Sequence, residues 1–242
     1  MRGAAALLLC ALALGGCESS QEKSAQIEKQ VKLAEARHPV SVARGLTIAH
    51  ASTQVKVLAT QILHDAEGTA AVVTLRNVSA HALRDVPIAI TVRDAGGRVL
   101  FQNNAPGLEA ALTSVPLLAP HAQFTWVDDQ VQVTGTPPTS VSALVGEAPQ
   151  APASAPQIGV SGVHATEEAG GAGAAGTVRN GSTVPQRNLV VYGVARRGGR
   201  VVAAGRAVLP ELAAHNSSPF QVLFIGSPTG ARLEMSAPPT TF

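Results

Sequence analysis

Hydrophobic and polar residues follow three successive patterns along this chain of 242 residues. Residues 4–14 form an unbroken apolar run near the N-terminus. Over residues 20–37 polar residues predominate, and a few apolar ones lie on one stripe at helical spacing: Ile27, Val31 and Ala34. This predicts a short polar helix that ends before Pro39. From about Thr53 onward apolar and polar residues alternate, which is typical of β-strands with one buried face.

The β-rich part carries its strongest signal at residues 86–93, where four β-branched residues share one face of the expected strand: Val86, Ile88, Ile90 and Val92. Residues 94–97, Asp-Ala-Gly-Gly, predict a hairpin turn after it. On a later strand Phe124 and Trp126 share a face and are candidate core residues. Six or seven short strands between residues 53 and 146 favour an antiparallel β-sandwich.

Two sequence blocks recur about 100 residues further on. Thr-Leu-Arg-Asn-Val-Ser at 74–79 resembles Thr-Val-Arg-Asn-Gly-Ser at 177–182, and Gly-Gly-Arg-Val occurs at both 96–99 and 198–201. Repetition at this length predicts duplicated domains rather than a solenoid. We therefore expect two sandwiches of one kind.

These patterns divide the chain into five expected parts. A signal peptide covers 1–16, and a lipid-anchored polar helical stalk covers 17–45. The first sandwich covers 46–146 and the second covers 157–242. The Pro/Ala-rich stretch 147–156 between them has little to bury, and such a composition predicts a semi-rigid linker.

The order of these blocks resembles the FxLYD type of immunoglobulin-like domain, which occurs in bacterial surface lipoproteins. The second copy fits best, through residues 176–180, 198–201 and 218–222. The similarity covers about two thirds of the chain, and the Leu-Tyr-Asp signature of the family is absent. It implies an all-β fold of two immunoglobulin-like antiparallel sandwiches, and it transfers no catalytic residue to this chain.

The N-terminus has the layout of a secretory signal peptide, with Arg2 followed by the apolar run and then by small residues. The run is far shorter than the ~20 residues that a transmembrane helix needs. Residues 14–17, Leu-Gly-Gly-Cys, resemble the bacterial lipobox, which implies cleavage between Gly16 and Cys17 and lipid on Cys17. Two or more acyl chains hold a protein stably on a bilayer. We therefore expect the chain on the cell membrane or outer membrane, facing outside the cytoplasm. The alternative is an ordinary signal peptide with a chance cysteine.

Composition narrows the classes of function. Cys10 leaves with the signal and Cys17 carries the lipid, so no cysteine remains for a disulfide, a thiolate metal site or thiol catalysis. Without Arg2, the mature chain has 17 basic and 16 acidic residues. This near balance argues against a nucleic-acid partner, which would require a clustered basic face.

Several motifs suggest chemistry, and each has a simpler interpretation. Residues 171–176 match the Gly-x-Gly-x-x-Gly dinucleotide motif without the required strand before and helix after, so a flexible hairpin loop is favoured. The acidic pairs at 128–129 and 167–168 cannot readily serve one catalytic centre, because adjacent residues of a strand point to opposite faces. We expect both pairs in surface loops. The Asn-x-Ser triplets at 77–79 and 180–182 are expected to close turns at strand ends.

Scattered loop positions are expected for the seven histidines, because no two have a His-x-x-x-His spacing: His38, His50, His64, His81, His121, His164 and His215. We therefore expect no catalytic residue, metal ligand or cofactor. The chain is predicted to be a non-enzymatic interaction or structural module with an envelope protein as its partner. The alternatives are an accessory subunit of an envelope transport or secretion complex, and a metal-dependent binder or enzyme formed by converging histidines.

Replacing Cys17 with serine tests the predicted anchor. A serine hydroxyl is a far poorer nucleophile than the thiol that forms the thioether, so Cys17→Ser should release the protein or leave an unprocessed precursor. Cell fractionation together with the mass of the protein measures both outcomes. A processed Cys17→Ser chain that stays fully in the membrane fraction would contradict the prediction.

Overall fold

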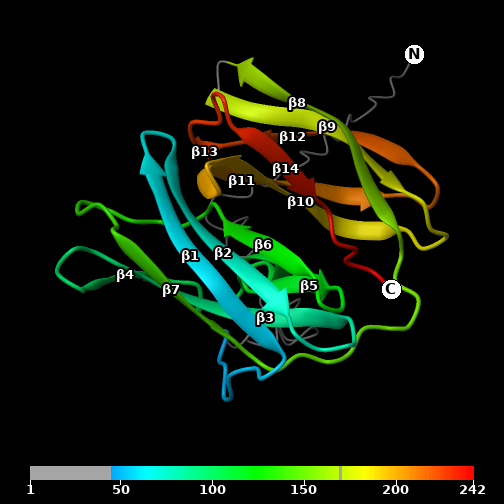
Figure 1. Cartoon of the computed structure of the whole chain (residues 1–242), viewed down its shortest axis with the longest axis horizontal. Coiled ribbons are helices and arrows are strands. Elements are labelled where there is room, and N and C mark those ends of the chain that lie inside the picture. Colours follow the sequence, from blue (N-terminus) through cyan, green and yellow to red (C-terminus); the bar gives the residue numbers. More distant parts are fainter. Residues whose placement is uncertain (1–44, 169–170) are drawn as a thin grey trace, which may run out of the picture. The chain divides into compact units, whose positions relative to one another are not determined.

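The computed structural model describes residues 45–168 and 171–242 (Figure 1). Apart from one 3₁₀ turn at Ala110–Leu112, its regular elements are β-strands that pair antiparallel. This confirms the all-β class of antiparallel sandwiches predicted from the sequence. Among these residues, no helix has the length and apolarity to cross a bilayer. The signal peptide, the lipobox and the predicted helix lie outside the described residues.

The first sandwich, β1 to β7, consists of two sheets. One has the order β1-β2-β6 and contains β1 (Val55–Asp65), β2 (Gly68–Asn77) and β6 (Gln123–Asp128). The other is built around β3 and contains β3 (Leu83–Arg93), β4 (Val99–Gln102), β5 (Ser114–Leu118) and β7 (Ser140–Val145). β5 and β4 pair with successive parts of β3, and β7 also pairs with it. The segment with the clearest alternation in the sequence is therefore the central strand of its sheet.

The second sandwich, β8 to β14, repeats this arrangement (Figure 1). One sheet has the order β8-β9-β12 and contains β8 (Ile158–Glu168), β9 (Gly171–Asn180) and β12 (Ser217–Leu223). The other has the order β13-β11-β10-β14 and contains β10 (Gln186–Arg197), β11 (Arg200–Leu212), β13 (Ile225–Gly226) and β14 (Arg232–Ser236). The single strand β11 pairs with β10 as β5 and β4 together pair with β3. The sequence repeat thus corresponds to a repeat of strand pairing.

The two Asn-x-Ser triplets form the same buried hydrogen-bond network in both copies. The Asn77 Nδ2 donates to three carbonyls, those of His81, Leu118 and Ala119, at 2.7, 3.2 and 3.1 Å. The Asn180 Nδ2 donates to the equivalent carbonyls of Val184, Leu212 and Ala213 at 2.9, 3.4 and 3.2 Å. Each Asn Oδ1 accepts from the backbone N–H and the hydroxyl of the serine two residues later. The triplets close turns at strand ends, as predicted, and they also tie the two sheets of each sandwich together.

The glycine-rich run 171–176 forms part of β9, so the expected hairpin loop is wrong for these residues. A Cβ at Gly173 would come within 2.4 Å of the Val222 carbonyl oxygen, and one at Gly176 within 2.8 Å of the Phe220 ring. Glycine is required at 173, where a side chain would meet the backbone of β12, while at 176 a side chain would displace the Phe220 ring. The match of these residues to the Gly-x-Gly-x-x-Gly dinucleotide motif therefore reflects packing within a sheet.

Residues 147–156, which we expected to form a linker, run beside the first sandwich. Gln150 forms a β-bridge with Leu83. The Arg84 N–H donates to the Pro149 carbonyl at 3.0 Å, and the Ala151 N–H donates to the Ala82 carbonyl at 2.8 Å. The stretch thus holds fixed backbone contacts before β8 begins.

Strand β10 is buried on both of its faces, and this joins the two sandwiches. Alternate residues pack into the core of the second sandwich: Leu189, Val191 and Ala195. The residues between them pack into the cluster that contains the core of the first sandwich: Val190, Tyr192 and Val194. Successive residues of a strand point to opposite faces, so one strand serves both cores. Residues 44–242 accordingly form one compact unit.

The repeated asparagine network gives a paired prediction for stability. Asn77→Ala and Asn180→Ala should each lower the free energy of unfolding by about 3 kcal/mol, because each removes three hydrogen bonds to carbonyls and two from the following serine. Urea unfolding measures the change. The exposed Asn104→Ala is the control and should stay within about 0.5 kcal/mol of the parent. Equal small losses for all three variants would contradict the assigned role.

Candidate functional site

A buried ion pair fastens the first sandwich to the second. Asp129 follows β6, and Arg206 lies on β11. The Asp129 Oδ1 accepts from the Arg206 Nε at 2.9 Å and pairs with its Nη2 at 2.8 Å, while Oδ2 accepts from the Arg206 backbone N–H at 2.9 Å. The side chains are 2% exposed for Arg206 and 19% for Asp129. Removing either partner from such a pair strands a buried charge, which typically costs about 3–5 kcal/mol.

Asp128 lies beside this pair and is itself buried. The residue is 1% exposed, and one carboxylate oxygen accepts from the Gln130 N–H at 2.9 Å. Burial raises the pKa of Asp128 to about 6, against the lowering effects of that hydrogen bond and of the Arg206 charge. We expected the acidic pair 128–129 in a surface loop, and the structure corrects this. A solvent-facing loop would not hold a carboxyl group that is this strongly desolvated.

Tyr192 completes this polar cluster. It is the register partner of Arg206 on the neighbouring strand, and its ring meets Phe124 edge-on at a centroid distance of 5.2 Å. Burial raises the pKa of the Tyr192 phenol well above its usual value. The Tyr192 hydroxyl and the Arg206 Nη1 are buried without a hydrogen-bond partner among the described residues. These two donors belong to neighbouring residues, and they add to the buried polar groups at an interface that is otherwise formed by apolar side chains.

An open groove lies between the two sandwiches, next to this cluster. Its larger part has a volume of about 790 Å³, and an adjoining part has about 390 Å³. The two parts share four lining residues, two from each sandwich: Gln123, Phe124, Met235 and Ser236. The larger part is lined mainly by apolar side chains and prolines from β5, β8 and the C-terminal segment. At the smaller part the Arg196 Nη2 donates to the Thr125 hydroxyl at 2.7 Å, and its Nε pairs with Glu234 at 3.0 Å.

The backbone of β6 presents an open edge along this groove. β6 pairs only with β2 within the described residues. The Asn77 N–H donates to the Ala122 carbonyl, and backbone groups alternate in direction along an antiparallel strand. The N–H and C=O groups of Gln123 and Thr125 therefore point away from β2, toward the edge without a strand partner. Both residues line the groove.

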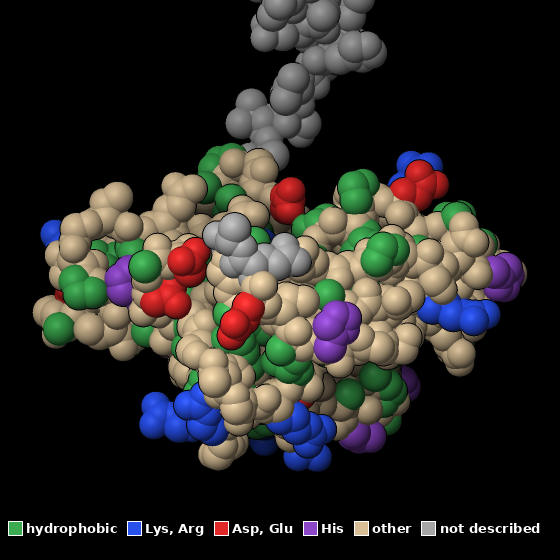
Figure 2. Space-filling model, turned by 90° about the horizontal axis from the view of Figure 1, so that it is seen from above, with side chains coloured by type: hydrophobic (Ala, Val, Ile, Leu, Met, Phe, Trp, Pro, Cys, Tyr) green, Lys and Arg blue, Asp and Glu red, His purple; other side chains and the backbone are tan. Residues whose placement is uncertain are grey.

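The residues singled out in the sequence do not converge here. Cys17, Gly16 and His38 lie outside the described residues. The remaining histidines lie on separate strands and turns, and those visible in Figure 2 lie apart from one another. Within the described part of the chain, no group of three or more His, Cys, Asp or Glu has the geometry of a metal site. Trp126 is buried, as its core-like position predicted, and Tyr192 is buried as well.

Sequence reasoning missed the interface, although one signal for it was present. Residues 189–194 read Leu-Val-Val-Tyr-Gly-Val, an almost continuous apolar run, whereas the equivalent 86–93 alternates. A continuous run indicates a strand buried on both faces. The Asp129–Arg206 pair had no comparable signal, because the two residues are 77 positions apart and meet only across the interface.

Comparisons with known proteins establish no relationship. No family model matches the chain, and no curated protein does. A solved structure of the exo-chitosanase CsxA from Amycolatopsis orientalis aligns with a TM-score of 0.27 and 14% identity, over 76% of this chain and 26% of that one. A complex of the same enzyme with PNP-beta-D-glucosamine gives 0.26 and 14%, over 74% and 25%. The chain thus spans about a quarter of these proteins, and at such scores the likeness carries no argument about family or activity.

Asp128 should make stability depend on pH. Its pKa is about 6 in the folded state against an ordinary value of 3.8, so the folded protein binds this proton more tightly. The stabilisation is complete below about pH 4 and is lost as the pH rises through 6. Urea unfolding of wild type and Asp128→Asn from pH 4 to 7 should therefore diverge by roughly 2 kcal/mol in favour of the variant at the higher pH. A difference that stays constant with pH would contradict this.

Proposed function

We propose that this chain is a lipid-anchored protein of the bacterial cell envelope, whose two sandwiches act as one rigid, non-catalytic binding module. The signal-peptide layout and the Leu-Gly-Gly-Cys sequence at 14–17 support the anchor, with lipid on Cys17. The shared faces of β10 and the Asp129–Arg206 pair support rigidity, since both oppose movement of one sandwich against the other.

The groove between the sandwiches carries the proposal of binding. It combines an apolar lining with the open backbone edge of β6, and these are the two features that recognise an extended polypeptide segment. Main-chain hydrogen bonds to Gln123 and Thr125 would supply affinity, and the apolar walls would select side chains. The proposed ligand is therefore an extended segment of an envelope protein partner.

Site-specific photo-crosslinking in intact cells tests this function. Gln123 and Gln157 are exposed residues that line the groove, and each is replaced in turn by a photoreactive phenylalanine analogue. Gln102 and Gln221 are exposed glutamines outside the groove and serve as matched controls. We expect the groove positions to give one shared crosslinked product, identified by mass spectrometry, that the control positions do not give.

The same experiment has clear negative outcomes. Identical products from all four positions would indicate contact by proximity alone, and no product from either groove position would contradict binding there. Membrane attachment is measured separately with Cys17→Ser, so failure of the groove proposal leaves the anchor proposal standing.

A further inference from the structure

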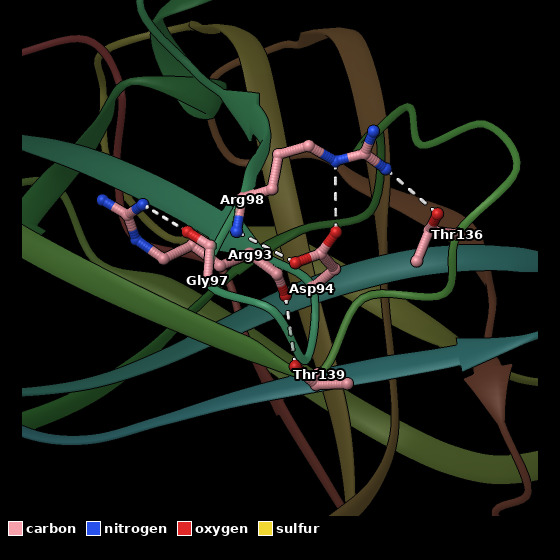
Figure 3. Close-up of polar contacts among 6 residues, drawn as sticks. All are labelled: Arg93, Asp94, Gly97, Arg98, Thr136 and Thr139. Carbon is pink, nitrogen blue, oxygen red and sulfur yellow. Dashed lines mark hydrogen bonds and ion pairs between the residues drawn. The ribbon is translucent and has the colours of Figure 1, made fainter.

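The β3–β4 turn of the first sandwich contains an acidic clamp (Figure 3). The Asp94 carboxylate accepts from the Arg98 backbone N–H at 2.9 Å and from its Nε at 3.1 Å. Burial acts to raise the pKa of this carboxyl, but the hydrogen bonds and charge of Arg98 outweigh it and lower the pKa. The Arg93 Nη1 donates to the Gly97 carbonyl at 2.9 Å. The turn therefore keeps one acid among its arginines.

The equivalent β10–β11 turn lacks the acid and is one residue shorter, because two residues separate Arg197 from Arg200 and three separate Asp94 from Arg98. Its sequence is Arg-Arg-Gly-Gly-Arg at 196–200, so Arg197 stands where the first copy has Asp94. The Arg196 Nη1 contacts the Gly199 carbonyl at 3.4 Å, as Arg93 contacts Gly97. Gly199 and Gly97 share a left-handed backbone, with φ of 81° and 82°. The shorter turn thus forms with an arginine at the position where the longer turn has its acid.

Four arginines lie in two pairs at this end of the second sandwich, one pair on each face of the sheet, and we call them the arginine tip: Arg196 with Arg232, and Arg197 with Arg200. Arg197 lies directly opposite Arg200 on β11, and Arg196 lies directly opposite Arg232 on β14. Glu234 is the acid that pairs here, at 3.0 Å from Arg196 and 3.8 Å from Arg232. Like charges directly opposite each other on paired strands are destabilising. The tip therefore has an excess of positive charge that an anionic partner would relieve.

The tip is accessible to such a partner. Arg197 and Arg200 are exposed, and the Arg232 side chain is 83% exposed. Guanidinium groups are planar and donate two parallel hydrogen bonds, which suits phosphate oxygens. The chemistry of the tip thus fits a surface of closely spaced phosphate groups.

We propose that the arginine tip docks on the phosphate groups of anionic phospholipids at the membrane surface. This inference rests on the proposed function, because the lipid on Cys17 would hold the tip at that surface. Residues 18–43 connect the anchor to the compact unit, and with the predicted helix at 20–37 and the other residues extended they can span up to ~55 Å, so the tip can reach the bilayer. Tethering raises the local concentration of headgroups, so weak individual contacts suffice for docking. Docking would fix which way the groove faces.

Binding of the unlipidated mature chain to vesicles tests the proposal. Residues 17–242 carrying Cys17→Ser are mixed with vesicles of phosphatidylcholine alone, or of phosphatidylcholine with phosphatidylglycerol, and pelleted. We expect binding only to the anionic vesicles, weakening as salt is added. Arg197→Asp places an acid directly opposite Arg200, where the two side chains can pair, so the fold should be kept. This reversal of one charge should weaken binding by on the order of tenfold.

Arg76→Asp is the matched control, since it makes the same charge change at an exposed position of β2. It should bind nearly as well as the parent, and circular dichroism checks the fold of both variants. Equal weakening by Arg76→Asp and Arg197→Asp would overturn the proposal in favour of a general charge effect. Competition by inorganic phosphate that exceeds competition by chloride at equal ionic strength would also overturn it, because the tip would then be a discrete phosphate site. Absence of binding to anionic vesicles would overturn it as well and would leave the anchor untouched, because the chain tested carries no lipid.

Discussion

Strand β10 packs against apolar side chains on both of its faces, and the arrangement of the two sandwiches depends on this double burial. One set of alternating residues completes the core of the second sandwich, and the other set extends the core of the first. Burying Tyr192 and its neighbours removes a large apolar area from water, which supplies most of the energy of the contact. That energy is not directional, so it does not by itself fix how the two sheets are oriented.

Orientation is fixed by the polar groups within this apolar contact. Asp129 receives three donors from a single residue, Arg206, and this geometry is satisfied in one relative position only. Three further polar groups lie in the same region and have fewer hydrogen-bond partners than Asp129: the Asp128 carboxylate, the Tyr192 hydroxyl and the Arg206 Nη1. In such an interface the apolar contact holds the two sandwiches together, and the buried polar groups within it lower the stability. The benefit is a groove whose two walls come from different sandwiches and keep a constant separation.

Duplication provides an internal comparison that separates what the fold requires from what it tolerates. Both copies keep the buried asparagine and its serine, because each asparagine links carbonyls at two strand ends and binds the serine that follows it. Both copies also keep a left-handed residue after β5 or β11, His121 in one and His215 in the other. The acid of the first hairpin turn is absent from the second turn, which is one residue shorter and has an arginine before its two glycines. Differences at such permitted positions are where the copies are free to acquire separate roles.

The sequence by itself determined the local features of this protein. Alternation along 86–93 predicted a half-buried strand, Asp-Ala-Gly-Gly predicted its turn, and the repeated Asn-x-Ser triplets predicted closed strand ends, because each depends on interactions between near neighbours. The lipobox at Cys17 is likewise a local signal, and it stays a prediction. Tertiary structure alone decided the rest: that Asp128 is buried, that Asp129 meets Arg206, and that β6 borders a groove. These features join residues far apart in the chain, and the energy that brings them together comes from burying one strand between two cores, which no single segment specifies.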